Sequence, residues 1–328
     1  MGELLSRRRQ DTARRIEELR AKLADAEKLC GDKACVYATG SFGRREASRH
    51  SDLDLFIVGE GSRKDPKLSR LDEILVKAGL IKATRELKLP EFSGGGQYLV
   101  GHTVSELVDT LGSPEDDAEN TFTARLLLLL ESFPLLGKPA YDQITNKVVR
   151  AYWKDYKGHE RDFIPAFLTN DVLRMWRTFC VNYEARTRRE PEKEMAKRRL
   201  KNYKLKHSRL LTCYSAILYL LAVFSKNKTV SPSDARSMIS FTPTERLEWL
   251  LSQPELGDAH SSVRKLIEGY EAFLSNTDAS EEELVLRFMD KGKRRECFDS
   301  AYRFGELVFE VMGAIGKKSP PFHRLLVV

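Results

Sequence analysis

Two aspartates, one residue apart, open an apolar stretch soon after a glycine turn. The segment Thr39–Phe56 reads TGSFGRREASRHSDLDLF and contains Gly40 and Ser41, then Asp52 and Asp54. Because side chains alternate in a strand, both carboxylates are predicted to share one face, about 7 Å apart. Such a pair repels unless a positive group lies between. A divalent ion is the usual partner: Mg²⁺ takes oxygens from one or two Asp and completes its shell with water and substrate phosphates.

The upstream turn supplies groups that suit a phosphate. At a turn after a strand, Gly40 lets backbone N–H groups approach a phosphate closely, and the Ser41 hydroxyl adds a donor. Arg44 and Arg45 can pair with a triphosphate. A lone Gly-Ser or a lone Asp-x-Asp is more often a plain loop or a chance pattern. The combination, with an apolar strand continuing from it, favours a site for metal-assisted phosphoryl chemistry.

Regular elements are needed on both sides of this segment to position it. The apolar spacing predicts a long amphipathic helix over Glu3–Leu29 and strands over Cys35–Ala38 and Leu53–Val58. A second amphipathic helix is predicted at Pro66–Lys77, and a further strand at Gln97–Gly101 after the loop Ser93–Gly96.

From about residue 115 onward the pattern is helical. No strand is predicted before the last four residues. Helices are predicted in eight segments: 124–133, 163–183, 196–224, 232–240, 243–251, 262–274, 280–289 and 295–315. The fold class is therefore α+β, with a small mixed-sheet domain over 1–115 and an all-helical domain over 116–328 that closes a nucleotide cleft.

The segment that contains Gly40 and the two aspartates resembles a known family signature. GSFGRREASRHSDLDLFIV resembles the signature of the DNA polymerase β-type nucleotidyltransferase superfamily: Gly-Ser, a gap, then Asp-x-Asp. It is most similar to the PII uridylyltransferase-like branch, with weaker similarity at Gly101–Leu107 and Thr123–Leu130. The resemblance implies that Asp52 and Asp54 bind catalytic Mg²⁺ (or Mn²⁺). It also makes Gly40 and Ser41 contacts of the nucleotide phosphates, assisted by Arg44.

The superfamily has a third carboxylate on a later strand, and its position here is open. Glu91 is the first candidate, followed by Glu86 and Glu106; each can equally be a surface acid. The chain also departs from the branch, because no His-Asp dipeptide occurs among its six histidines. The hydrolytic module that reverses uridylylation is therefore not expected, and only the transferase core is implied.

Basic residues are concentrated in one segment. The chain carries a net charge of +7, and Arg186–Arg209 holds eleven Lys/Arg against three Glu. The resemblance implies that the helical domain lends a lysine, for which Lys204 is the candidate, and Arg174 with Asn170 can line the same cleft. The alternative is a solvated helix surface. Clustered basic residues also suit an anionic acceptor such as tRNA.

Taken together, the sequence predicts an enzyme that transfers an NMP from an NTP, ATP or UTP, to a hydroxyl acceptor on protein, RNA or a small molecule, releasing pyrophosphate. Three alternatives stay open: an RNA-modifying, toxin-like transferase, a transferase that forms a nucleotide second messenger, and a catalytically weak nucleotide-binding regulatory protein. Five scattered cysteines without C-x-x-C spacing predict a cytoplasmic protein, and the short apolar runs predict no membrane span.

Overall fold

The computed structural model of the chain describes residues 2–92, 96, 99–184 and 191–327. It has two compact units. One is Leu5–Lys154, and the other consists of Asp155–Val328 together with Met1–Leu4. The expected boundary near residue 115 thus lies inside the first unit. The α+β fold class is confirmed: the protein is 71% helical, with a small mixed sheet near the N-terminus.

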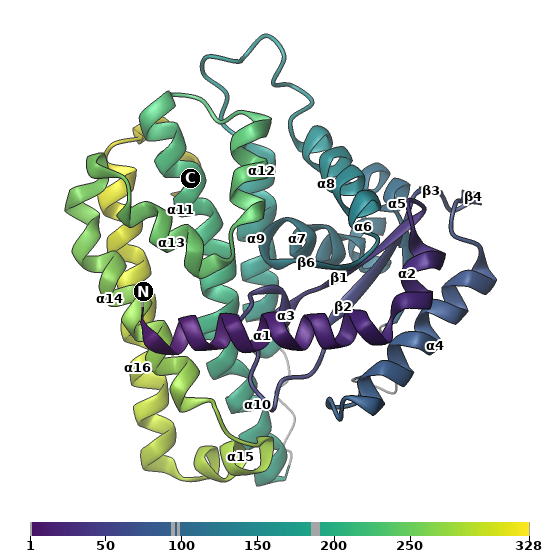
Figure 1. Ribbon diagram of the computed structural model, residues 1–328. Coiled ribbons are helices and arrows are strands. Elements are labelled where there is room, and N and C mark those ends of the chain that lie inside the picture. The colour runs from purple at the N-terminus through teal and green to yellow at the C-terminus, as the bar shows by residue number, and fades with distance from the viewer. Residues whose placement is uncertain (1, 93–95, 97–98, 185–190, 328) are drawn as a thin grey trace. The chain divides into compact units, whose positions relative to one another are not determined.

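The first unit contains a four-stranded sheet in the order β5-β2-β1-β6 (Figure 1). Its strands are β1 (Ala34–Ala38), β2 (Leu55–Gly59), β5 (Gly101–Thr103) and β6 (Phe133–Leu136). Strand β1 pairs antiparallel with both β2 and β6, whereas β5 pairs parallel with β2. The predicted loop and strand at Ser93–Gly101 lie partly outside the described residues.

Strand β6 was not predicted, because its sequence Phe-Pro-Leu-Leu is short and contains a proline. Pro134 has no N–H to donate, and such a residue is tolerated where only one neighbour pairs with the strand. β6 is an edge strand of this kind, paired with β1 alone. Since β6 completes the sheet, the helices around it belong to the first unit.

Helices cover both faces of the sheet. One face packs on α1 (Glu3–Lys22), α2 (Ala24–Cys30) and α4 (Arg70–Glu86), and the shared core contains Ile16, Val36, Ile57 and Leu80. Tyr37 points to the other face, where its hydroxyl donates to the Ala124 carbonyl 2.9 Å away on α7 (Thr121–Glu131). Its ring also contacts Tyr141 on α8 (Lys138–Tyr152). The alternation of β1 side chains therefore builds two cores.

The remaining helices of the first unit are short: α3 (Gly40–Gly43), α5 (Val104–Asp109) and α6 (Glu115–Ala118). A two-stranded hairpin of β3 (Gly61–Ser62) and β4 (Asp65–Pro66) follows β2. Arg125 on α7 is fully buried and donates to Asp116 of α6 and to the Leu107 carbonyl of α5. One buried guanidinium thus ties three helices together.

The second unit is helical throughout its described residues. Its elements are α9 (Ala166–Glu184), α10 (Glu192–Lys204), a π-helical turn (Leu205–Arg209), α11 (Leu210–Asn227), α12 (Pro232–Ser240), α13 (Pro243–Leu251), a 3₁₀ turn (Pro254–Leu256), α14 (Gly257–Asn276), α15 (Glu281–Met289), α16 (Lys291–Gly316) and α17 (Pro320–Val327). The strand signal at the last four residues was wrong for the described part, which is helical. There Phe322 is buried against Phe224 of α11.

One described helical run, Glu192–Asn227, is long and apolar enough to cross a membrane. Within it, 78% of the most apolar window is buried inside the protein. Core helices meet the same criterion, so length and composition alone are weak evidence for a span.

His207, in the π-helical turn, is buried among aromatic rings. It stacks on Phe273 with ring centroids 4.5 Å apart, and burial lowers the pKa of His207 to about 4. Unfolded His titrates near pH 6.5. Between these values the unfolded chain binds the extra proton, so stability falls as pH drops from about 6.5 to about 4, by up to about 1.4 kcal/mol per pH unit.

Replacing this residue with a ring that does not titrate is expected to remove the pH dependence. We expect the melting temperature of His207→Phe to decline less than that of the wild type between pH 6.5 and 4.5. Thermal melts at pH 4.5, 5.5, 6.5 and 7.5 measure this. Parallel declines in the two proteins would show that His207 is not the responsible group.

Candidate active site

Asp52 and Asp54 immediately precede β2 rather than lying inside it. The predicted strand began at Leu53, but ladder pairing with β1 begins at Leu55, opposite Ala38. The chain after Ala38 enters the helical turn α3, which leaves residues 52 and 53 without a strand partner. One backbone bond extends the pairing: the Thr39 N–H donates to the Asp54 carbonyl at 2.8 Å.

The alternation of side chains holds across this segment. Leu53 and Leu55 are 3% and 7% exposed and belong to the core under the sheet, whereas Asp52 and Asp54 are exposed. The two leucines therefore anchor the chain and turn both carboxylates toward solvent. This is the arrangement that the Asp-x-Asp pattern predicts.

Helix α1 holds the loop that leads into the aspartates. The Ala47 N–H donates to the Thr12 hydroxyl at 2.9 Å, and Arg15 donates to the Ser48 carbonyl. The Arg15 guanidinium also lies 4.7 Å from the centre of the Phe42 ring. Helix α1 thus fixes both the loop and the glycine turn.

The Gly-Ser turn lies directly against Asp54. Gly40 has φ +62°, and a Cβ built on it would lie 2.6 Å from Asp54 Oδ2. A Cβ on Gly43 would lie 2.0 Å from the Glu131 carbonyl oxygen. Both glycines of G-S-F-G are therefore required for close packing, and Gly40 also for its left-handed backbone. In the structure, the turn predicted at Gly40–Gly43 is a four-residue helix, α3.

Glu131, which was not predicted from the sequence, stabilises this turn by accepting hydrogen bonds from it. Its side chain is fully buried at the end of α7; Oε1 accepts from the Gly40 N–H at 3.1 Å, and Oε2 accepts from Arg44 at 2.8 Å. The N–H of Gly40 that was predicted to meet a phosphate therefore already has a protein acceptor. A lone acid ending the run LLLLLE was the available signal.

Arg44 is 7% exposed and is paired with two carboxylates. Besides Glu131, its Nε donates to Glu46 at 2.6 Å. Burial and this double pairing give Arg44 a role in holding the turn; its predicted contact with a triphosphate stays a prediction. Ser41, next to Gly40, is half-buried.

None of the three candidate acids lies on the strand beside β2. Glu91 follows α4, with a side chain 80% exposed and 3.6 Å from Arg85. Glu86 pairs with Lys22, and Glu106 caps α5 by accepting from the Thr103 N–H at 2.7 Å. The paired residues of β5 are Gly, His and Thr. The catalytic role of Glu91 stays a prediction.

Lys204 and Arg174 both lie in the helical unit. Lys204 ends α10 and is half-buried, and Arg174 on α9 lies 3.8 Å from Asp171. The predicted contacts of Lys204 and Arg174 with a nucleotide stay predictions. Residues 186–190 of the basic segment lie outside the described part of the chain.

The comparisons with known proteins agree with this geometry over one segment. Residues 16–94 match the family model described as "Nucleotidyltransferase domain". This segment, about a quarter of the chain, is similar to nucleotidyltransferase domains. The match spans the last third of α1, the glycine turn, both aspartates, β2 and α4, and it indicates a nucleotidyltransferase enzyme with an NTP as substrate. The uridylyltransferase-like branch stays a prediction. No curated protein and no solved structure matches the chain.

Close packing at Gly40 of the nucleotidyltransferase domain can be tested with a matched pair of variants. Gly40→Ala places a methyl group against Asp54, so we expect a rate of pyrophosphate release at least about tenfold lower. We also expect the melting temperature to fall by about 2–8 °C because alanine is strained at positive φ. Gly31→Ala is the control: its φ is +47°, but the nearest atom to its Cβ is 3.8 Å away. If both variants lose activity equally, contact with Asp54 is not the cause.

Proposed function

We propose that the chain transfers an NMP from an NTP to a hydroxyl acceptor, releases pyrophosphate, and uses Asp52 and Asp54 to bind Mg²⁺. One observation carries this proposal. The two exposed carboxylates follow the loop held by α1, and Asp54 packs against Gly40, so the two halves of the motif lie together. The nucleotidyltransferase domain match supports the reaction class.

The donor set suits a hard divalent cation. Among the described residues, no three His, Cys, Asp or Glu side chains cluster into a metal site. Two exposed Asp carboxylates fit Mg²⁺, which binds through one or two carboxylates and keeps positions for water and phosphate oxygens. Mn²⁺ accepts the same oxygen ligands. When bound, the ion would neutralise charge that develops on the transferred phosphoryl group.

The protein's own part is positioning. Leu53 and Leu55 fix the direction of the carboxylates, and Gly40, held by Glu131, keeps the turn against Asp54. Phosphoryl transfer depends mainly on positioning and electrostatic stabilisation, so a rigid support under the two aspartates is what this reaction requires.

An anionic acceptor, of which RNA is one form, is favoured by the basic segment. Lys193, Lys201 and Lys206 of α10 and the π-helical turn are exposed, while Leu200 and Tyr203 are buried. A helix that buries one face and exposes lysines on the other can neutralise backbone phosphates.

We propose a cytoplasmic location, which the five free cysteines support.

A catalytically weak nucleotide-binding regulatory protein is the second candidate. The specific observation that favours it is the Gly-His-Thr sequence of β5, which offers no carboxylate beside β2. The chain would then bind an NTP and transfer its NMP only slowly, with release of pyrophosphate.

The experiment that separates the two candidates is release of pyrophosphate from each of the four NTPs. The wild type is measured with Mg²⁺, with Mn²⁺ and with EDTA, beside the Asp52→Ala/Asp54→Ala variant. We expect release that depends on the metal and is lost in the variant. Equal signals from both proteins would overturn the enzyme proposal.

The acceptor class can be read from the product. Purified protein, α-phosphate-labelled NTPs and a cell lysate are incubated together, and label is followed into protein, RNA and small nucleotides. We expect label in RNA. Label confined to protein or to small molecules would overturn the RNA proposal but not the transferase proposal.

A further inference from the structure

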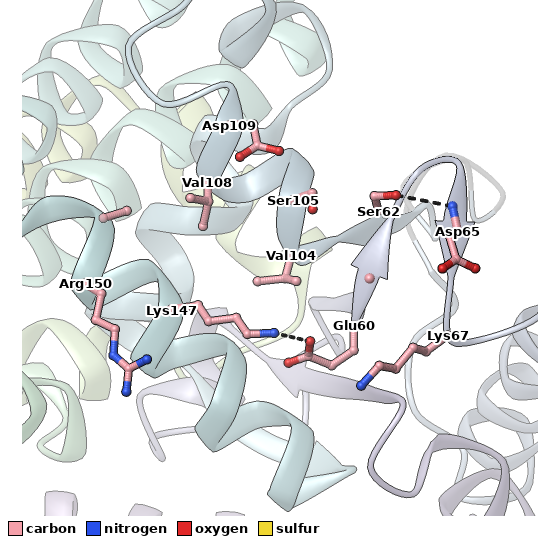
Figure 2. A pocket seen from close by; sticks show the side chains of 12 residues that line it. Glu60, Ser62, Asp65, Lys67, Val104, Ser105, Val108, Asp109, Lys147 and Arg150 are labelled. Carbon is pink, nitrogen blue, oxygen red and sulfur yellow. Dashed lines mark hydrogen bonds and ion pairs between the residues drawn. The ribbon is translucent and has the colours of Figure 1, made fainter. Parts of the chain in front are cut away.

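A cavity of about 770 Å³ lies in the first unit at the far end of β2 from the aspartates (Figure 2). Asp54 precedes β2 and Glu60 follows it. Six residues at about 3.3 Å each separate these positions by about 20 Å. The walls come from the β3–β4 hairpin, α5 and α8. This cavity is therefore distinct from the candidate active site.

Glu60 carries the observation that points to a ligand. It is 1% exposed and lines the cavity. One carboxylate oxygen, Oε2, accepts from the Lys147 ammonium, as Figure 2 shows. The other, Oε1, is buried and has no hydrogen-bond partner among the described residues. A buried carboxylate oxygen without a donor is unfavourable, and a cavity beside it gives room for a donor from outside the chain.

The partner of Glu60 selects the kind of donor. Because the Lys147 ammonium already neutralises this carboxylate, a second cation would meet a like charge there. A neutral N–H or O–H group avoids that repulsion. Val104 and Val108 of α5 supply an apolar wall for the body of the ligand.

Two further cations line the cavity, Lys67 and Arg150, and so do two further acids, Asp65 and Asp109. Arg150 lies one turn beyond Lys147 on α8, and Lys67 lies on the other side of Glu60 from Lys147 (Figure 2). Both basic side chains are exposed. Figure 2 shows Asp109 beside Val108 and Asp65 beside Ser62, away from Arg150, so a negative group on the ligand is favoured at Arg150. Residues three apart on a helix are neighbours, so an anion bound by the Arg150 guanidinium lies next to the Lys147–Glu60 pair and its neutral donor site.

We propose that this cavity binds a small phosphorylated ligand, with its phosphate at Arg150 and a neutral amino or hydroxyl donor at Glu60 Oε1. Its size suits a ligand as large as a nucleotide. At about 20 Å from Asp54, a molecule held here does not reach the candidate active site, so the cavity is an effector site rather than an acceptor site.

Equilibrium dialysis in EDTA tests the proposal, using the Asp52→Ala/Asp54→Ala protein so that metal-dependent nucleotide binding is removed. The probes are AMP, ribose 5-phosphate, inorganic phosphate and adenosine. We expect AMP or ribose 5-phosphate to bind with a Kd below about 1 mM, and adenosine at least about tenfold more weakly. Nucleotide and sugar phosphate sources of the ligand are thus distinguished by which of the two binds.

Variants added to this protein locate the binding. Arg150→Ala and Glu60→Gln are expected to weaken binding about tenfold, and Val108→Phe, which fills the cavity, to abolish it. Lys154→Ala removes the same charge from an exposed residue outside the cavity and is expected to change Kd less than twofold. Because Glu60→Gln can impair folding, the other two variants decide the outcome.

Binding of neither phosphate ester would overturn the proposal and would assign Glu60 Oε1 to ordered water. Adenosine binding as tightly as AMP would overturn the phosphate assignment. Affinity unchanged in both Arg150→Ala and Val108→Phe would show that the compounds bind elsewhere. None of these results depends on whether the chain transfers an NMP.

Discussion

Asp54→Asn is expected to lower Mg²⁺-dependent pyrophosphate release by about a thousandfold or more. The substitution keeps the size of the side chain and removes the charge that we propose binds the metal. A metal ion supplies several kcal/mol of transition-state charge stabilisation, and each 1.36 kcal/mol is about tenfold in rate. Asp52→Asn is expected to act in the same direction. Steady-state release of pyrophosphate at saturating NTP measures both effects.

The fold should survive these substitutions, which separates the chemistry from stability. Both aspartates are exposed, so without metal the melting temperatures of the two Asn variants should stay close to that of the wild type. Mg²⁺ should raise the melting temperature of the wild type and not that of Asp54→Asn. Asp32→Asn, an exposed acid in the turn before β1, is the control. An Asp54→Asn protein that keeps full activity would refute the assignment of the metal site.

Glu131→Ala is expected to lower the free energy of unfolding by about 3–5 kcal/mol, which corresponds to about 6–20 °C in melting temperature. The loss has two sources. The Arg44 guanidinium keeps Glu46 but loses its second carboxylate, and the Gly40 N–H loses its acceptor. Removing one member of a buried charge network is costly because the others stay buried.

Glu131→Gln is the control for this prediction. Its amide oxygen can still accept from one of the two donors, so we expect a smaller loss of stability than in Glu131→Ala. Chemical denaturation with urea measures all three proteins. If alanine and glutamine at this position cost the same, hydrogen bonding to Gly40 does not contribute. If neither costs more than about 1 kcal/mol, the buried network is not what holds the turn.

Much of the nucleotidyltransferase domain was predictable because its signals are local. Gly40, Ser41, Asp52 and Asp54 lie within fifteen residues of one another, and the alternation around Leu53 predicted that both carboxylates lie on the side opposite Leu53 and Leu55. Strand β1 and the helix before it follow from periodicity.

The features that were missed depend on contacts between distant parts of the chain. Glu131 lies 91 residues from Gly40, and nothing in its own neighbourhood shows what it binds. Strand β6 needs β1 to exist as its partner, so the short segment Phe133–Leu136 carries too few residues for a period-two signal. The third carboxylate could not be placed from sequence for the same reason: its identity depends on which residues lie beside β2.

The bond between Gly40 and Glu131 also has a consequence for the order of folding. Gly40 and Asp54 meet through a short antiparallel hairpin, which closes at a low entropic cost. Closing the 91-residue loop to Glu131 costs more chain entropy, so this contact is expected late, after α7 has formed. The two aspartates proposed to bind the metal would then be in place before the turn beside them becomes rigid. Refolding should show two steps: the contact between Gly40 and Asp54 forms first, and the hydrogen bond between Gly40 and Glu131 forms second.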